Sequence, residues 1–249
     1  MKNKKYTFGN VTFEIESPYS HEDKNCDAFR SDREADCVIR VCPCEGDAGA
    51  SCKPERSGNV ITRYLPGDYA SGLSMATLLA SSEAAFIFPE HDAFILHAAY
   101  VVHEGQAILF TAPSGTGKST QANFWKSERG AEIVNGDRVL ITRCGGRFYA
   151  NGIYASGTSG ICRNVTAPIR AVVLLEQGTD NALNAISPRM LFLRILCECS
   201  YDIKNRAQCG KMTELVSDMI NTLPVVCYRC RNNPDSVDAL ERILSWKKE

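Results

Sequence analysis

The sequence predicts a mixed α/β (α+β) fold built on a mixed sheet, preceded by a β-rich N-terminal region. Three observations lead to this prediction. A Gly-rich segment lies between an apolar run and a helical pattern near the middle of the chain. A hairpin pattern follows that helix, where a doubly wound fold would place a second crossover helix. Alternation of apolar and polar residues recurs over about the first 90 residues, which favours strands there.

The N-terminal region begins with a hairpin. Residues 6–15 alternate apolar and polar side chains on both sides of Gly9-Asn10, a dipeptide typical of two-residue hairpin turns. Residue spacing and turn-forming composition predict the elements that follow: loops at 17–34 and 44–58, strands at 36–41 and 59–65, and a helix at 72–85. We therefore expect residues 1–90 to form a β-rich region packed on a core of residues 91–249.

The core is predicted to combine strands and helices around a central hairpin. Apolar runs, helical spacing and Gly or Pro punctuation place its elements in this order: strands at 94–102 and 107–111, a helix at 119–129, an extended segment at 133–134, a hairpin at 139–150, a strand at 170–176, helices at 189–199 and 213–221, a strand at 224–231 and a helix at 236–246. The hairpin indicates a mixed or largely antiparallel sheet around the Gly-rich segment.

Charge and hydropathy exclude two classes of partner. The chain has 28 Lys and Arg against 29 Asp and Glu, so its formal net charge is -1. A chain with this balance has no extended basic face for a nucleic acid. No apolar run approaches the roughly 20 residues of a membrane helix, and the Lys-rich start leads into strand residues rather than a signal-peptide core. We therefore expect a cytoplasmic protein that binds neither nucleic acid nor membrane.

The 12 cysteines are expected to be reduced thiols. They are scattered along a chain without an export signal, which disfavours a disulfide framework. Three close pairs leave a structural metal as the alternative: Cys42 with Cys44, Cys197 with Cys199, and Cys227 with Cys230. The last pair lies in a predicted strand, where turn-type zinc knuckles do not form, so buried or half-buried thiols are the favoured interpretation.

The Gly-rich segment has the residues of a phosphate-binding loop. It runs Ala112-Pro113-Ser114-Gly115-Thr116-Gly117-Lys118-Ser119 and continues to Thr120. Small residues let successive backbone N–H groups turn toward an anion, and the helix that follows adds a favourable dipole. Lys118 is expected to reach the outer phosphates of ATP, and the Ser119 hydroxyl to ligate Mg²⁺. The alternative is a chance Gly-rich turn or a decayed site.

Two further residues are candidates for chemistry. Asp137 follows the short apolar pair Ile133-Val134, at the predicted end of a strand neighbouring the loop's strand. Phosphoryl transfer needs a carboxylate that holds the metal or takes a proton from the attacking hydroxyl, and Asp137 is placed to do either. A turn Asp in Asn135-Gly136-Asp137 is the alternative. His97 lies in an apolar strand pattern, where a lone His is more often a core residue than a catalyst.

The order His97, loop, Asp137 resembles the catalytic core of the HPr kinase/phosphorylase family, whose nucleotide-binding fold is shared with PEP carboxykinase. Leu96-His97, Ser114-Gly115-Thr116-Gly117-Lys118-Ser119 and Gly136-Asp137 match its three elements. The similarity is good over residues 94–142 and looser beyond. It implies that Asp137 accepts the proton of the substrate hydroxyl and that His97 assists at the transferring phosphate. It also implies a homo-oligomer, although the surfaces involved cannot be traced in this sequence.

The chain departs from that family in three respects. Gly136 replaces the first residue of an acidic pair, which puts a reverse phosphorolysis reaction in doubt. The later segment that supplies a Glu for magnesium has no clear match in residues 149–154. The family's N-terminal regulatory domain is replaced by the shorter β-rich region. These departures resemble the trimmed relatives of the family, so HPr itself is not the expected substrate.

Two functions remain open from the sequence. The first is an ATP- and Mg²⁺-dependent kinase that phosphorylates a hydroxyl on a small molecule or on a peptide or protein Ser. The second is a nucleotide-gated binding protein for a peptide or protein, with little or no turnover, which the missing acidic residues favour. An ordinary P-loop ATPase is disfavoured, because such folds need parallel crossovers around the loop rather than the hairpin predicted after Asp137.

Overall fold

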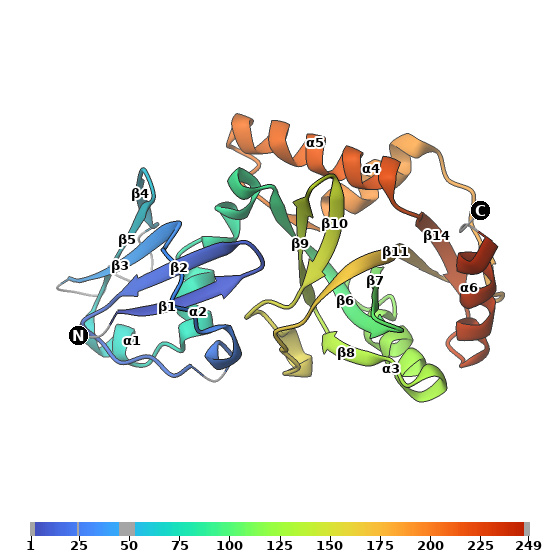
Figure 1. Cartoon of the computed structure of the whole chain (residues 1–249), viewed down its shortest axis with the longest axis horizontal. Helices are drawn as coiled ribbons and strands as arrows, with labels where there is room; N and C mark the ends of the chain where they lie inside the picture. The colour runs from blue at the N-terminus through green and yellow to red at the C-terminus, as the bar shows by residue number, and fades with distance from the viewer. Residues whose placement is uncertain (1–2, 24, 45–52, 247–249) are drawn as a thin grey trace.

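The computed structural model describes residues 3–23, 25–44 and 53–246, which form two sheets with helices around them (Figure 1). The chain starts with the predicted hairpin of β1 (Lys4–Phe8) and β2 (Val11–Glu16), paired antiparallel around Gly9-Asn10. Gly9 has a φ of 57°, in the left-handed region that the two-residue turn requires. The prediction of a sheet-rich start is thus confirmed.

The first sheet has the strand order β1-β2-β3-β5-β4. The predicted strands are present as β3 (Cys37–Pro43) and β5 (Val60–Leu65), which pair in parallel with each other. The loop predicted at 44–58 is wrong at its end, because β4 (Glu55–Ser57) folds back antiparallel onto β5 around Gly58. Residues 45–52 of that predicted loop, and residue 24 of the loop predicted at 17–34, lie outside the described residues. A short 3-10 helix, η1 (Asp27–Phe29), lies within the loop predicted at 17–34.

The single helix predicted at 72–85 is wrong. Short helices occupy this part of the chain: α1 (Gly67–Ser71), α2 (Met75–Ser81), η3 (Ala84–Phe86) and η4 (Phe88–His91). The Ser74 side chain accepts a hydrogen bond from Thr77 N and so begins α2 later than predicted. Glu83, with a φ of 55°, breaks the chain direction after α2. Apolar spacing alone does not reveal these two local interruptions.

The second sheet is mixed, as predicted, and its strand order is β10-β9-β6-β7-β11-β14-β12. Its strands are β6 (Ala93–His103), β7 (Gln106–Thr111), β8 (Glu132–Asn135), β9 (Arg138–Cys144), β10 (Arg147–Asn151), β11 (Thr166–Gln177), β12 (Ala182–Leu183), β13 (Cys199–Ser200) and β14 (Val225–Cys230). The predicted hairpin is β9–β10, and β10 also pairs with β11, so five strands form a closed ring. Strands β7, β11 and β14 run parallel, so their carboxyl ends meet at one edge. That edge holds the Gly-rich segment.

Helices cover both faces of the second sheet. They are α3 (Lys118–Arg129), α4 (Pro188–Cys197), α5 (Arg206–Thr222) and α6 (Asp235–Trp246). In Figure 1, α4 and α5 run along the top of the molecule, while α3 and α6 lie on the other side of the sheet. Helix α5 begins at Arg206 rather than at 213, because the Asn205 side chain accepts hydrogen bonds from Ala207 N and Gln208 N. Polar residues in its first turns hid this start from the apolar pattern.

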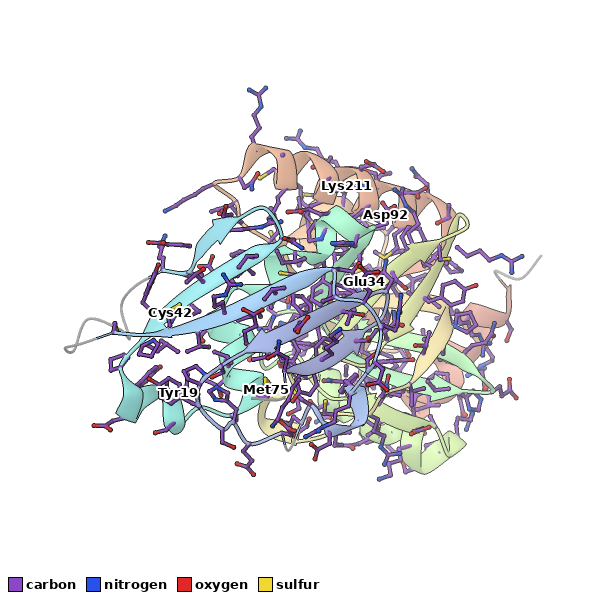
Figure 2. The ribbon with its side chains drawn as sticks, turned by 60° about the vertical axis from the view of Figure 1, so that its left-hand side comes forward. Tyr19, Glu34, Cys42, Met75, Asp92 and Lys211 are labelled. Carbon is purple, nitrogen blue, oxygen red and sulfur yellow. The ribbon has the colours of Figure 1, made fainter. Side chains whose placement is uncertain are left out.

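The N-terminal sheet and the second sheet share a hydrophobic core. Side chains of the first sheet cluster with Ile95, Leu140 and Tyr154, which come from the second sheet and the segment after β10. At the surface, Lys211 Nζ of α5 lies 2.8 Å from a carboxylate oxygen of Asp92, close to the junction of the two regions, and Figure 2 shows both residues. The packing is thus continuous across the predicted boundary at residue 90, and division into two domains there stays a prediction.

The Gly9 turn docks the first sheet onto the second, which allows a test. A Cβ at Gly9 would lie 2.8 Å from Thr142 Cγ2 and 2.9 Å from Leu140 Cδ2. Gly58 has nearly the same φ, 59° against 57°, but a Cβ added there would meet nothing within 4 Å. We expect Gly58→Ala to cost about 1–2 kcal/mol of unfolding free energy for the left-handed backbone alone. Gly9→Ala should cost about 1–3 kcal/mol more because of crowding. Urea unfolding of both variants measures the difference, and equal costs would contradict the docking role.

Two further properties concern the chain as a whole. Over residues 3–23, 25–44 and 53–246, no helix combines the length and apolar character that crossing a membrane requires. The described cysteines are free thiols, and Cys26, Cys37, Cys227 and Cys230 are buried. Burial raises the pKa of the Cys227 thiol to about 11, which keeps it protonated at neutral pH.

Candidate active site

The Gly-rich segment forms a turn between the end of β7 and the start of α3. Gly115 and Gly117 have φ values of 80° and 115°. A side chain at Gly117 would be strained at that φ, so the conformation depends on glycine. Gly117 is also the N-cap of α3 and offers no side chain to the first amides of the helix. Those N–H groups are therefore left to water or to an anion, as a phosphate-binding loop requires.

Lys118 is folded back against the loop. Lys118 is only 7% exposed, and its Nζ donates hydrogen bonds to Ala112 O (2.7 Å) and Pro113 O (3.3 Å). Burial lowers the pKa of Lys118, while the negative charges of Glu198 and Asp137 act in the opposite direction. The loop thus holds a buried amino group close to two carboxylates.

One open pocket of about 280 Å³ brings most of the predicted site residues together. It is lined by His97, Ser114, Gly115, Gly117, Lys118, Ser119, Thr120, Gly136, Asp137 and Ser159. Thr116 does not line this pocket; its hydroxyl donates to Pro113 O (2.9 Å) and so braces the loop from within. The pocket therefore joins the Gly-rich loop on one wall to an imidazole and a carboxylate on the other.

Asp137 reaches this pocket because another residue makes the turn. The buried Asn135 side chain accepts hydrogen bonds from Asp137 N (2.9 Å) and Arg138 N (3.0 Å). The Asp137 carboxylate is therefore free of the capping role that its sequence context suggested. The prediction that it ends a strand neighbouring the loop's strand is wrong, because β8 pairs with β6 rather than with β7. Asp137 instead lies beside β6, where its carbonyl accepts a hydrogen bond from Ala98 N (3.0 Å).

His97 lies between two carboxylates at the wall of the pocket. Its side chain is 25% exposed, which does not fit a core histidine. Nε2 lies 3.3 Å from Asp137 Oδ1, slightly longer than a usual N–H···O hydrogen bond. Nδ1 lies 2.9 Å from Glu198 Oε2, within normal hydrogen-bond distance. The imidazole is thus held from both ends.

The sequence reasoning missed three residues at this site. Glu198 is 101 residues from His97 in the chain. Arg138 places Nε 3.4 Å from Asp137 Oδ2 and donates from a terminal nitrogen to Ser200 Oγ (2.9 Å). Ser159 lies on η5 (Gly157–Ser159), opposite Gly136. Arg138 is adjacent to a candidate, which is a usable signal, whereas nothing in residue spacing indicates Glu198.

Gly136 is required by packing against Ser159. A Cβ at Gly136 would lie 2.5 Å from Ser159 Oγ and 2.7 Å from Ser159 Cβ. The 2.7 Å contact involves a Cβ atom, which cannot move without the backbone. The acidic residue that the resembling family carries at this position therefore does not fit beside η5 as it is placed here.

A double-mutant cycle tests this contact. Gly136→Ala is expected to lower the free energy of unfolding by about 1–3 kcal/mol through overpacking. In a Ser159→Gly background the same change should cost clearly less, because the clashing atoms are gone. Thermal or urea unfolding of the four proteins gives the coupling. An equal cost in both backgrounds would show that Ser159 does not set the requirement for glycine.

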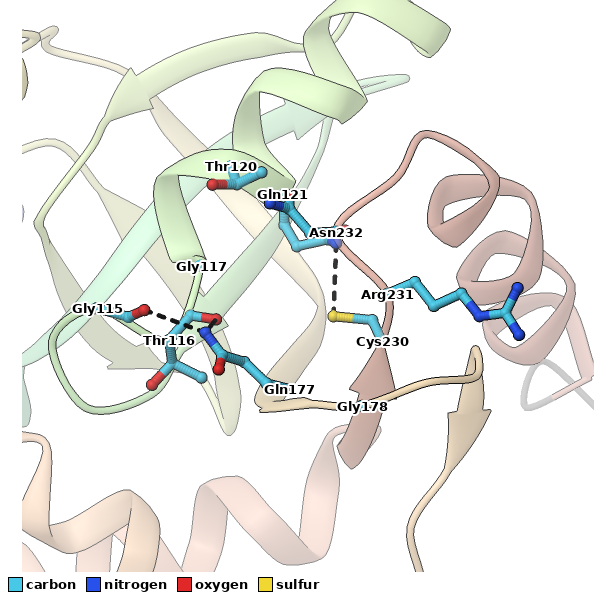
Figure 3. Close-up of a pocket in the computed structure, with 10 residues that line it drawn as sticks. All are labelled: Gly115, Thr116, Gly117, Thr120, Gln121, Gln177, Gly178, Cys230, Arg231 and Asn232. Carbon is cyan, nitrogen blue, oxygen red and sulfur yellow. Dashed lines mark hydrogen bonds between the residues drawn. The ribbon is translucent and has the colours of Figure 1, made fainter.

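A second pocket of about 360 Å³ lies on the other side of the loop (Figure 3). It is lined by Gly115, Thr116, Gly117, Thr120, Gln121, Gln177, Gly178, Cys230, Arg231 and Asn232. These residues come from the carboxyl ends of the parallel strands β7, β11 and β14 and from the segments that follow them. Figure 3 shows Gln177 pointing at the loop, where Nε2 lies 3.3 Å from Gly115 O and 3.5 Å from Thr116 O. The loop thus separates two pockets: the first contains carboxylate, lysine and imidazole groups, and the second contains the side chains of Arg231 and of three amides.

The site offers oxygen ligands of the kind that Mg²⁺ prefers. The exposed Ser119 hydroxyl and the Asp137 carboxylate line the same pocket. Mg²⁺ commonly takes one or two protein oxygens and completes its shell with water and phosphates. Within the described ranges, no three His, Cys, Asp or Glu side chains are grouped as a protein-only metal site would need. The two oxygens therefore fit a Mg²⁺ ion that arrives with a phosphate ligand.

Comparisons with known proteins show a distant structural likeness. No protein-family model matches the sequence, and no curated protein matches it. Among solved structures, the chain is similar to the HPr(Ser) kinase/phosphatase from Coxiella burnetii, at 14% sequence identity and a TM-score of 0.35. The match covers 61% of this chain and 91% of that one. A TM-score this low carries no argument about activity, so what the site can do follows from its own residues and their geometry.

Proposed function

We propose that this protein is an ATP- and Mg²⁺-dependent kinase that transfers the γ-phosphoryl group to a hydroxyl, on a small molecule or on a peptide or protein Ser. The observation that carries the proposal is one open pocket with Lys118 and the loop on one wall and Asp137 on the other. Phosphoryl transfer requires a cradle for the phosphates and a carboxylate beyond them. This pocket has both.

The residues divide the reaction between them. The loop amides and Lys118 bind the β- and γ-phosphates, and Asp137 receives the proton of the acceptor hydroxyl. The acceptor oxygen forms a bond to the γ-phosphorus, while the bond from that phosphorus to the bridging oxygen breaks and ADP leaves with the electron pair. Mg²⁺, held by Ser119 and Asp137, would neutralise charge on the phosphates when bound. His97 faces the same space from the side of Asp137.

The pocket on the other side of the loop supports ATP as the nucleotide. It is continuous with the loop and large enough to receive a nucleoside. The Asn232 amide in its lining carries both a donor and an acceptor for the edge of adenine, whereas the lining includes no carboxylate to accept from guanine. We therefore expect ATP to bind more tightly than GTP or inorganic tripolyphosphate.

A nucleotide-gated binding protein is the second candidate. One observation favours it: Gly136 leaves the site with Asp137 as its single carboxylate at this turn, and Arg138 is paired with that carboxylate. Asp137 Oδ2 lies beside the Arg138 guanidinium and Oδ1 beside the His97 ring, so both oxygens already have a neighbour that competes with an acceptor hydroxyl. In this alternative, bound nucleotide orders the pocket while transfer is slow or absent.

Label transfer separates the two candidates. Purified protein is incubated with Mg²⁺ and γ-labelled ATP, alone, with free serine, and with fractions of small molecules and of Ser-containing peptides. The kinase proposal expects labelled acceptor and stoichiometric ADP, both formed at a strongly reduced rate by Asp137→Asn. Tight ATP binding without label on any acceptor and without hydrolysis would reject the kinase and leave the binding protein. Isothermal titration with ATP, GTP and tripolyphosphate tests the nucleoside pocket in the same preparation.

A further inference from the structure

Glu198 is tied to His97 through both backbone and side chain. His97 N donates to Glu198 O (2.9 Å), and the ladder continues as β13 pairs with β6, with Cys199 opposite Leu96. The Glu198 carboxylate then reaches back to Nδ1 of the same histidine, at 2.9 Å. Its side chain is 12% exposed. The two residues are therefore held in one fixed relation although they are far apart in the chain.

The hydrogen bond to Glu198 indicates which ring nitrogen of His97 carries a proton. An ionised carboxylate can only accept hydrogen bonds, so the proton in the contact to Glu198 resides on Nδ1 of His97. Once Nδ1 is held, the ring plane is set, and Nε2 is directed to Asp137 and to the pocket beside the loop. Nε2 is thereby the ring nitrogen that faces an anion bound in the pocket.

We infer that Glu198 is a positioning residue of this site, which holds the His97 imidazole so that its Nε2 faces the phosphoryl group in transfer. The inference rests on the kinase proposal and deepens it, because it names the residue on a different element that orients His97. Glu198 does not itself line the pocket, whereas His97 does. The carboxylate therefore acts through the imidazole.

The surrounding charges are consistent with this arrangement. Three segments bring charged groups to the imidazole on β6: the segment before β9 carries Asp137, β9 begins with Arg138, and the turn after α4 carries Glu198. Lys118 faces the same carboxylates from α3, and the charge of Glu198 opposes the lowering of its pKa by burial. Two carboxylates, one lysine and one arginine thus surround the imidazole at the place where phosphate charge would develop.

Kinetics of two Glu198 variants test the inference. Glu198→Ala removes the acceptor, and we expect kcat for label transfer to fall about 10- to 100-fold with a much smaller change in KM for ATP, as for other residues that orient a functional histidine. Glu198→Gln keeps an acceptor oxygen of the same reach and should lose less. Asp202→Asn is the matched control, since Asp202 lies in the same segment and its carboxylate accepts only from Lys204 N (2.9 Å) among the described residues.

A cycle with His97 distinguishes positioning from a merely structural role. In a His97→Ala background, Glu198→Ala is expected to cause no further loss of kcat, because the group it orients is gone. A structural role predicts the same loss in both backgrounds, accompanied by a lower Tm. Equal losses, or a wild-type kcat in Glu198→Ala, would overturn the inference while leaving the kinase proposal intact.

A second readout does not depend on activity. In ¹⁵N–¹H correlation spectra of the histidine rings, His97 is expected to carry a hydrogen-bonded proton on Nδ1 in the wild type and to lose that signal in Glu198→Ala. An unprotonated Nδ1 in the folded wild type overturns the inference whatever the kinetics show. A wild-type protein that transfers no label to any acceptor overturns the kinase proposal, and the positioning role with it.

Discussion

Asp137→Asn is expected to lower kcat for phosphoryl transfer by about 10²- to 10⁴-fold, the usual contribution of a general base. The amide keeps the size of the carboxylate but cannot accept the proton of the acceptor hydroxyl. ATP affinity should change little, because the loop and Lys118 provide the main phosphate contacts. Steady-state kinetics with the acceptor found by label transfer, together with a binding isotherm for ATP, measure both quantities.

The control for that variant is Asp235→Asn, at the first turn of α6 and outside the lining of both pockets. It should leave kcat and the Kd for ATP unchanged. A full kcat in Asp137→Asn would remove the base from the mechanism and leave Asp137 as a residue of the turn. A large rise in the Kd for Mg²⁺–ATP with an unchanged kcat would instead assign Asp137 to metal binding alone.

Lys118→Ala is expected to raise the Kd for ATP roughly 10- to 150-fold, since a hydrogen bond to a charged group contributes about 1.5–3 kcal/mol. The lysine is already held against the loop by Ala112 O and Pro113 O, so it needs little ordering when phosphate arrives. Lys126→Ala, on the exposed side of the same helix, is the matched control. Isothermal titration of ATP into both variants measures the effect.

Stability has to be measured alongside this binding. Removing the Lys118 ammonium leaves Ala112 O without the hydrogen bond it accepts, so the nucleotide-free Tm is recorded for each variant. An unchanged Kd in a folded Lys118→Ala protein would contradict the phosphate-binding loop itself. Binding lost in Lys118→Ala but kept in Asp137→Asn, with no transfer in the wild type, would favour the nucleotide-gated binding protein.

Several elements could be predicted because their signals are local. The Gly9-Asn10 turn, the hairpin of β9 and β10 and the loop before α3 each depend on a few consecutive residues. Glycine at a positive φ and apolar alternation act over short stretches of chain, and sequence reasoning reads them well. The mixed character of the second sheet followed from one such hairpin.

The ends of other helices depend on single polar side chains, which the spacing of apolar residues does not reveal. Ser74 and Glu83 divide the helix predicted at 72–85, and Asn205 starts α5 well before its apolar face becomes regular. A cap or a left-handed residue contributes only about 1 kcal/mol, yet it decides where a marginal helix ends. Such boundaries become visible only with the hydrogen bonds that make them.

Local sequence patterns predicted the chemical groups of the site: a Gly-rich loop with Lys118 and Ser119, and Asp137 and His97 as candidate catalytic residues. How these groups meet depends on tertiary contacts. Asn135 takes the turn and releases Asp137, Ser159 requires glycine at 136, and Glu198 reaches His97 across 101 residues. The physical reason is that strand pairing joins distant segments through backbone hydrogen bonds, and those bonds carry no signature in residue spacing.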